Sequence, residues 1–232
     1  MGAVRRVLLL ALSTLAGVLA AACEGRNAAP AAREAPPVVL LTAFEPFGGA
    51  PDNPSWEAIK DYEGKTIAGH LVRTARLPVV YDEMAKPLDA AIDAAKPAAV
   101  ISFGQGREII DVERTARNAY HPRKPPDNAG RPPPRERIVE GGADAIPTGL
   151  PVDAILKSLH EGKIAARDSS DAGGYLCNEC FYRLVAREGG PRRRGFVHVP
   201  RVGAANPLGG TYTIETLRRA VGIVVETTLT AP

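Results

Sequence analysis

The chain has 232 residues, 45% of them hydrophobic and 24% charged, which is enough for one compact domain with a buried core plus a non-globular end. Its net charge is only +3, and the basic residues are scattered without interleaved aromatic side chains, so the sequence argues against a nucleic-acid-binding protein. The three cysteines are too few for a disulfide framework.

The N-terminal segment has the pattern of an export signal. Arg5-Arg6 precedes an uncharged, mainly apolar run, Val7–Ala22, which is shorter than the roughly 20 residues of a membrane-spanning helix. Small residues then lead to Cys23 in a pattern similar to a bacterial lipoprotein box, where the cysteine becomes the lipidated N-terminus. We therefore predict a signal peptide at 1–23, with lipidation of Cys23 and plain cleavage both left open, and an Ala/Pro-rich tether at 24–37. The protein is then expected to be exported, as a periplasmic protein or a membrane-anchored lipoprotein.

Strand and helix patterns alternate along the predicted domain, residues 38–232. Continuous apolar runs that end in glycine loops predict strands buried on both faces at 38–44 and 98–104, and further strands are expected at 70–80 and 195–200. Helical patterns begin at Asn53, which is a good N-cap, and cover 82–96, 151–160, the segment from Cys177, and 213–229. The remaining segments are interpreted as a strand at 109–118, a proline-rich loop at 121–134 and a solvated turn at Arg192–Arg194.

This alternation predicts the fold class. Strands that alternate with helices favour an α/β protein, here a single-domain, three-layer α/β/α sandwich with a mainly parallel, mixed central sheet. Functional sites in such sheets lie outside the carboxyl ends of the strands. The glycine loops that follow residues 44 and 104 are therefore expected at one rim of the sheet.

Cys177 is the strongest candidate for chemistry. It follows Gly173-Gly174 at the start of a predicted helix, where unpaired backbone N–H groups and the helix dipole stabilise an anion such as a thiolate. We therefore interpret Cys177 as a nucleophile, which needs a base and a group that orients the base.

Two residues are candidates for these partners. His198 lies in a short apolar strand that follows the nucleophile; a lone strand histidine is otherwise a hydrogen-bonded core residue. Glu113 lies among hydrophobic neighbours, where a carboxylate is costly to bury without a partner.

A second interpretation concerns the spacing of Cys177 and Cys180. The two form a C-x-x-C pair, which in an exported protein is typical of a thiol–disulfide site. The alternative is that Cys180 is a small apolar residue on the inner face of the helix. If the two thiols pair in an oxidising compartment, the nucleophile has an oxidative off-state.

Seven segments together resemble the pyroglutamyl peptidase I family, the pyrrolidone-carboxylate peptidases, which are cysteine peptidases. These segments, in chain order, are 42–49, 53–58, Gly106-Arg107 with 112–114 and Asn118, 126–128, 150–152, 172–178 and 196–200.

The resemblance implies a function and a set of roles. The family removes an N-terminal pyroglutamyl residue from peptides through a thioester intermediate. Carried over by motif, Cys177 is the nucleophile, His198 the base and Glu113 the orienting acid, while Arg107 helps to hold the oxyanion.

The resemblance also implies a substrate site. Phe44 and Phe47 match the aromatic residues that clamp the flat lactam ring, and Gly49 and Leu176 are expected beside them. An uncharged lactam needs apolar faces plus one donor and one acceptor for its C=O and N–H groups. Neither a metal nor a cofactor is implied.

Some alternatives stay open at this stage. The loop at 104–107 is shorter than in common members of the family, so a homologue that binds pyroglutamyl peptides without turnover remains a second hypothesis, and the C-x-x-C redox protein a third. The expected partners are peptides with an N-terminal pyroglutamate. Whether the chain forms a homo-oligomer is left open.

Overall fold

The computed structural model describes residues 35–106 and 108–232, and Ala35–Pro232 form one compact unit. The predicted signal peptide, Cys23 and most of the predicted tether lie outside the described residues, as does Arg107. In the described part of the chain, no helix is long and apolar enough to cross a membrane.

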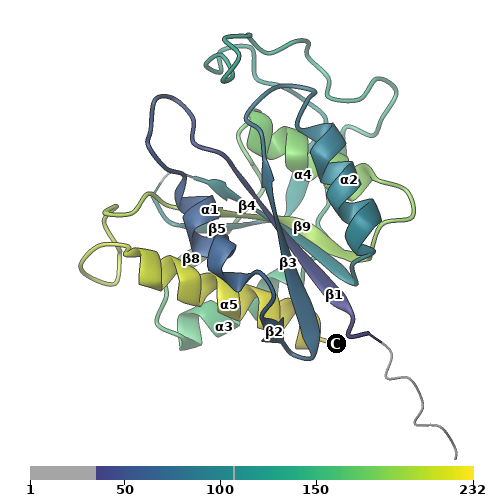
Figure 1. Ribbon diagram of the computed structural model, residues 1–232. Helices are drawn as coiled ribbons and strands as arrows, with labels where there is room; N and C mark the ends of the chain where they lie inside the picture. Colours follow the sequence, from purple (N-terminus) through teal and green to yellow (C-terminus); the bar gives the residue numbers. More distant parts are fainter. Residues whose placement is uncertain (1–34, 107) are drawn as a thin grey trace, which may run out of the picture. The chain divides into compact units, whose positions relative to one another are not determined.

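A mixed, mostly parallel sheet runs through the centre of this unit (Figure 1). Its strand order is β2-β3-β1-β4-β9-β5-β8, with bounds β1 Val38–Phe44, β2 Thr66–Ile67, β3 His70–Leu77, β4 Ala99–Gln105, β5 Ile110–Glu113, β8 Ala166–Ser169 and β9 Arg193–Val199. Strands β3, β1, β4 and β9 are parallel to one another, whereas β2 is antiparallel to β3, and β5 is antiparallel to β9 but parallel to β8. A separate antiparallel pair joins β6, Thr115–Arg117, to β7, Ala145–Pro147.

Helices cover both faces of the sheet, which confirms the predicted α/β class (Figure 1). The helices are α1 Pro54–Ile59, continued by the short 3₁₀ helix η1 Lys60–Tyr62, then α2 Ala85–Ala95, α3 Val152–Glu161, α4 Leu176–Ala186 and α5 Ile214–Thr230. Helices α1, α3 and α5 pack on one face, and α2 and α4 pack on the other.

The burial of β1 on both faces of the sheet explains why its sequence is almost entirely apolar. Successive side chains of a strand point to opposite faces. Leu41 accordingly packs in the core beneath α1, α3 and α5, while Leu40 and Phe44 pack in the core beneath α2 and α4. Both faces are buried, as the continuous apolar run predicted.

Helix α1 begins where the sequence predicted, after the N-cap Asn53. Asn53 Oδ1 accepts a hydrogen bond from Ser55 N at 3.0 Å, and Pro54 is the first helical residue, where a missing N–H costs nothing. The same asparagine donates through Nδ2 to Glu45 O at 3.0 Å. The cap therefore fastens the helix to the loop that follows β1.

The predicted solvated turn at Arg192–Arg194 is wrong. Arg193 and Arg194 belong to β9 and pair with Ala99 and Val100 of β4. Their guanidinium groups bind carbonyls at helix C-termini: Arg194 donates to Val185 O at 2.8 Å, and Arg193 donates to Ala231 O at 2.7 Å. Cations are favoured at this end of a helix, so tertiary contacts outweigh the turn-like composition.

The pairing of β9 with β4 and with β5 brings the candidate site residues together. Because β1, β4 and β9 are parallel, their carboxyl ends lie at one rim. Strand β5 runs the other way beside β9, with Asp111 opposite His198 and Val112 opposite Val197. Glu113 is therefore a diagonal neighbour of His198, within reach of its side chain.

Candidate active site

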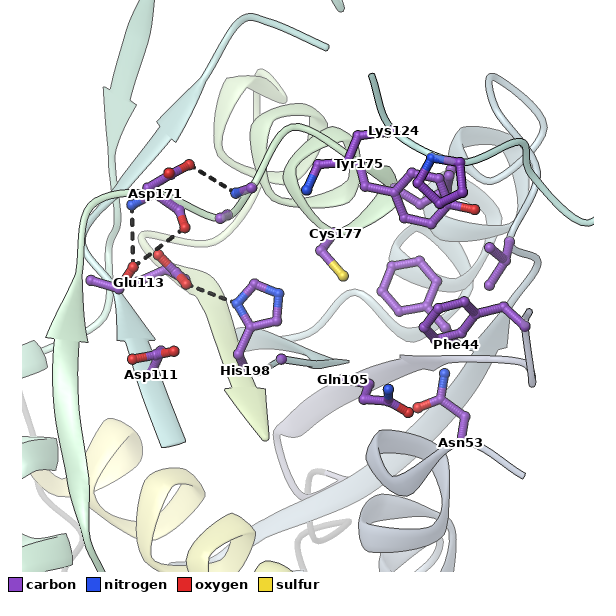
Figure 2. A pocket seen from close by; sticks show the side chains of 18 of the residues that line it. Phe44, Asn53, Gln105, Asp111, Glu113, Lys124, Asp171, Tyr175, Cys177 and His198 are labelled. Carbon is purple, nitrogen blue, oxygen red and sulfur yellow. Dashed lines mark hydrogen bonds and ion pairs between the residues drawn. The ribbon is translucent and has the colours of Figure 1, made fainter. Parts of the chain in front are cut away.

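A cavity of about 620 Å³ opens at this rim (Figure 2). One side of it is mainly apolar, with Phe44, Phe47, Val79, Tyr175 and Leu176. The other side is polar and charged, with Asp111, Glu113, Arg167, Asp168, Ser169 and Asp171. Cys177 and His198 also line it, and Figure 2 shows the Cys177 sulfur between the imidazole of His198 and the ring of Phe44.

Cys177 is the second residue of α4. The chain enters the helix through Gly173 and Gly174, whose φ values of +85° and +66° make a turn that other residues rarely adopt. Tyr175, the N-cap, is extended and makes no side-chain hydrogen bond to the helix start. The first N–H groups of α4 therefore have no side-chain cap from Tyr175, and they lie at the end of the helix that carries the thiol.

Asn178 fixes the position of this helix start. Its Nδ2 donates to Arg117 O and to Ala119 O, both at 2.8 Å, and its Oδ1 accepts from Arg117 N at 3.1 Å. The side chain is buried, so all three bonds form away from competing water. The turn that carries Cys177 is thereby attached to the last residue of β6 and to the segment that follows it.

The end of β4 passes very close to both candidate reactive side chains. A Cβ atom added to Gly104 would lie 2.8 Å from Cys177 Sγ and 2.7 Å from the Phe196 ring. A Cβ atom on Gly106 would lie 2.7 Å from His198 Cβ. The two glycines thus leave the space that the thiol and the imidazole occupy.

His198 and Glu113 form a buried pair. The Nδ1–H of His198 donates to Glu113 Oε1 at 2.8 Å, and the two residues are only 8% and 0% exposed. Burial lowers the pKa of His198, but the neighbouring Cys177 and the bond to Glu113 outweigh it and raise that pKa to about 10. Glu113 thus has the partner that its hydrophobic sequence context required.

Two pairs of aromatic rings form the apolar side of the cavity and its support. Phe44 packs on Phe196, and Phe47 packs on Tyr175, each pair with ring centroids 6.4 Å apart. The Tyr175 hydroxyl donates to Pro126 O at 3.1 Å and so fastens the proline-rich loop over this side. The arrangement offers flat apolar faces to a small ring.

Comparison with known proteins identifies the family. The sequence model of the family described as pyroglutamyl peptidase matches residues 38–229. The chain belongs to this family. It is therefore a cysteine peptidase, a hydrolase of the pyroglutamyl peptidase I type.

Curated relatives of this peptidase cover nearly the whole domain. The chain is 41% identical over 197 residues to a pyrrolidone-carboxylate peptidase of Chromobacterium violaceum, with 83% of this chain and 92% of the relative aligned. It is 38% identical over 201 residues to pyrrolidone-carboxylate peptidase 1 of Ralstonia nicotianae, with 83% and 93% aligned. An archaeal relative from Thermococcus onnurineus is 38% identical, with 83% and 99% aligned.

Solved structures agree with this assignment. Pyroglutamyl peptidase I of Bacillus amyloliquefaciens is 33% identical with a TM-score of 0.77, and 83% of this chain and 97% of that chain are covered. A mutant pyrrolidone carboxyl peptidase of Pyrococcus furiosus is 35% identical with a TM-score of 0.76, and 82% and 97% are covered. Both share the α/β fold described above.

The relatives overturn the predicted localisation. They are cytosolic enzymes, and the alignments cover 93% of the Ralstonia relative and 99% of the Thermococcus relative, so these proteins are almost entirely peptidase domain. The prediction of an exported periplasmic protein or membrane-anchored lipoprotein is therefore wrong. A basic start followed by a short apolar run is a signal from composition alone, which is weaker than the family match.

The structure brings most of the predicted site residues of the peptidase together. Phe44, Phe47, Glu113, Leu176, Cys177 and His198 all line the cavity. Gly49 does not: it lies in an exposed turn at a φ of +77°, with nothing within 4 Å of an added Cβ. Arg107 lies outside the described residues, so its predicted role remains a hypothesis.

Several lining residues were not singled out by the sequence. Tyr175 directly precedes Leu176 and Cys177, and an aromatic residue beside the predicted nucleophile was the available signal. Gln105 was visible only as part of a glycine loop, although its amide lines the cavity (Figure 2). Lys124 lies in the proline-rich loop, where no local pattern marks it.

Cys180 has a different environment from Cys177. Both thiols are free, and Cys180 is 0% exposed in the core between α4 and the sheet. Its thiol donates to Ser102 Oγ at 3.6 Å, and burial raises its pKa to about 12. Such a thiol is a poor nucleophile, so the structure favours the packing interpretation over the redox one.

Proposed function

We propose that this peptidase removes N-terminal pyroglutamate from peptides, with Cys177, His198 and Glu113 as its catalytic triad. The observation that carries the proposal is the buried His198, bonded to Glu113 at 2.8 Å and facing Cys177 in a cavity whose other side is aromatic. This arrangement matches the nucleophile, the base and the orienting group that such a mechanism needs, and so supports the proposal.

The first step forms the thioester. His198 takes the proton of Cys177, and the thiolate attacks the carbonyl carbon of the pyroglutamyl residue. Glu113 accepts the hydrogen bond from Nδ1, so Nε2 is the ring nitrogen that faces the thiol, and the carboxylate stabilises the imidazolium. The raised pKa of His198 favours this ion pair.

The charge that develops on the substrate oxygen needs donors. The uncapped N–H groups in the first turn of α4 lie beside Cys177 and suit an oxyanion. Arg107 is proposed as a further donor on the strength of the family motif. His198 then protonates the leaving amine, and a water molecule that it activates hydrolyses the thioester.

The apolar side is proposed to hold the lactam ring. Phe44, Phe47 and Tyr175 supply the flat faces, and the Gln105 amide supplies both a donor and an acceptor. A lactam presents its C=O and N–H on one edge, so one carboxamide can pair with both groups. Proline lacks the carbonyl and would leave that amide unpaired, which predicts strong discrimination against it.

A pair of fluorogenic amides tests the proposal. The purified protein should hydrolyse a pyroglutamyl amide and leave the matching prolyl amide essentially untouched. Iodoacetamide and Cys177→Ala should each abolish this hydrolysis. A protein that binds a pyroglutamyl peptide but never turns it over would contradict the proposal and select the binding homologue instead.

A further inference from the structure

A second cavity of about 400 Å³ adjoins the active-site cavity. The two cavities share Lys124, Asp171 and Gly173 in their walls. Three cationic side chains line the second one, Arg117, Arg123 and Lys124, and we call this surface the basic hollow. Neither the family comparison nor the triad explains it.

The basic hollow lies next to the nucleophile along the chain and in space. Gly173 and Gly174 form part of its wall and lie within four residues of Cys177. Asn178, which directly follows that cysteine, also lines the basic hollow. The Lys124 ammonium marks the border, because a Cβ atom added to Gly173 would lie 3.5 Å from its Nζ. Figure 2 shows this ammonium above Cys177, between Asp171 and Tyr175.

The charge of the basic hollow is not balanced by the described residues. Arg117, Arg123 and Lys124 form no ion pair with any residue that the structure describes, and Asp171 is the one carboxylate in the wall. Asp171 Oδ1 accepts a hydrogen bond from Gly173 N at 2.9 Å.

The opposite, charged side of the active-site cavity differs. There Arg167 pairs with Asp111 at 2.6 Å, and Arg114 pairs with Asp168 at 2.6 Å. Opposite charges thus meet on that side, whereas cations are in excess in the basic hollow.

Arg117 is held so that its charge faces this border. Its backbone N and O bond to Asn178, and its Nε donates to Ser170 O at 3.3 Å. The guanidinium therefore lies beside the segment that both cavities share. Its two outer nitrogens remain as donors for a planar anion such as a carboxylate.

We propose that the basic hollow binds a carboxylate of the leaving peptide, with Lys124 as the first cation that it meets. The inference rests on the proposed function, because a substrate held by its pyroglutamyl end against the aromatic rings places its scissile bond at Cys177, from which the leaving peptide can extend to Lys124 and Asp171 at this border (Figure 2). An extended residue spans about 3.3–3.6 Å, so two or three leaving residues reach about 7–11 Å from the scissile bond. Short pyroglutamyl peptides with a free C-terminus are therefore the favoured substrates.

Three peptides that differ in whether they carry a carboxylate, and in where they carry it, test this proposal. They are pyroglutamyl-Ala-Ala with a free carboxylate, the same peptide as a C-terminal amide, and pyroglutamyl-Ala-Glu amide. We expect kcat/KM to be about three- to tenfold higher for the free carboxylate than for its amide, mainly through KM, and to fall toward the amide value in high salt. If the Glu peptide shares the preference, an acidic side chain also serves; if it does not, the C-terminal carboxylate alone is recognised.

Variants locate the effect. Arg123→Gln combined with Lys124→Met should bring the ratio of the two rates to about one. Lys86→Met changes an exposed lysine of α2 that forms no ion pair with any residue that the structure describes, and it should keep the wild-type ratio. Equal rates for carboxylate and amide in the wild type would overturn the inference, as would a ratio that survives the double variant.

The neutral fluorogenic pyroglutamyl amide separates the two proposals. It carries no carboxylate, so its hydrolysis reports only on the triad and the aromatic side. Hydrolysis of this amide without any preference among the peptides would sink the basic hollow and leave the proposed function intact. No hydrolysis of any pyroglutamyl substrate would remove the proposed function itself.

Discussion

Cys177 and Cys180 lie one turn apart on α4, and they face opposite environments. Cys177 lines the cavity, over Gly104 and beside the buried pair of His198 and Glu113. Cys180 lies in the core, where its thiol meets the Ser102 hydroxyl. The difference teaches that two thiols on one helix can have unlike surroundings. The partners that other strands bring to a thiol decide its chemistry.

The largest effect is expected when the buried carboxylate loses its charge. Glu113→Gln should lower kcat/KM by roughly 10³-fold, because the imidazolium loses its anion and its fixed tautomer. The wild-type rate should fall at alkaline pH, as His198, whose pKa is raised to about 10, loses the proton that the leaving amine needs. Removal of the negative charge lowers this pKa, so the alkaline limb should move to lower pH. The pH dependence of kcat/KM measures both effects.

Glu179→Gln is the matched control for this prediction. Glu179, in the first turn of α4, is a fully buried acidic residue like Glu113. Its Oε1 accepts a hydrogen bond from Arg183 Nε at 2.8 Å, and it does not face His198. Its replacement should change stability and leave the alkaline limb in place. An unshifted limb in Glu113→Gln would mean that the carboxylate does not set the charge of His198.

A methyl group beneath the thiol should have the next largest effect. Gly104→Ala puts a Cβ atom 2.8 Å from Cys177 Sγ and 2.7 Å from the Phe196 ring, so the sulfur must move. A displacement of the sulfur by about 1 Å is expected to lower kcat by roughly 10²-fold. Steady-state kinetics, with thermal unfolding measured in parallel, checks this.

The matched glycine for this prediction is Gly222 in α5, far from the cavity. An added Cβ there meets the Tyr62 hydroxyl at 2.9 Å, so the local crowding is similar. Gly222→Ala should retain wild-type kcat. Equal losses in the two variants would trace the effect to general destabilisation rather than to the position of the thiol.

Cys180→Ala should have the smallest effect on activity. Its kcat/KM is expected to stay within about twofold of wild type, while loss of the buried sulfur lowers the free energy of unfolding by about 1 kcal/mol. Chemical denaturation and the fluorogenic assay measure the two quantities on one preparation. A large loss of activity at unchanged stability would revive the redox interpretation of the C-x-x-C pair.

The sequence predicted those features of the site that leave local signals. The apolar run of β1, the Asn53 cap and the helix start at Cys177 are each encoded by neighbouring residues. The bond between His198 and Glu113 joins residues 85 positions apart, and burial cost was the only local hint of it. Family motifs supplied the pairing that periodicity alone leaves open.

Other features depend on contacts that no local pattern encodes. The role of Gly104 arises from the approach of β4 to α4, and the strand conformation of Arg194 depends on a carbonyl at the end of that helix. Lys124 reaches the cavity because Tyr175 and Pro126 hold its loop in place. Each of these requires the assembled tertiary structure.

Alkylation with limiting iodoacetamide at neutral pH tests whether Cys177 is the nucleophile. Peptide mass spectrometry locates the adduct on Cys23, Cys177 or Cys180 while hydrolysis of the pyroglutamyl amide is followed in the same samples. We expect activity to fall in proportion to modification of Cys177, with Cys180 unmodified in the folded protein. Full activity with Cys177 alkylated, or loss of activity that tracks Cys180, would contradict it.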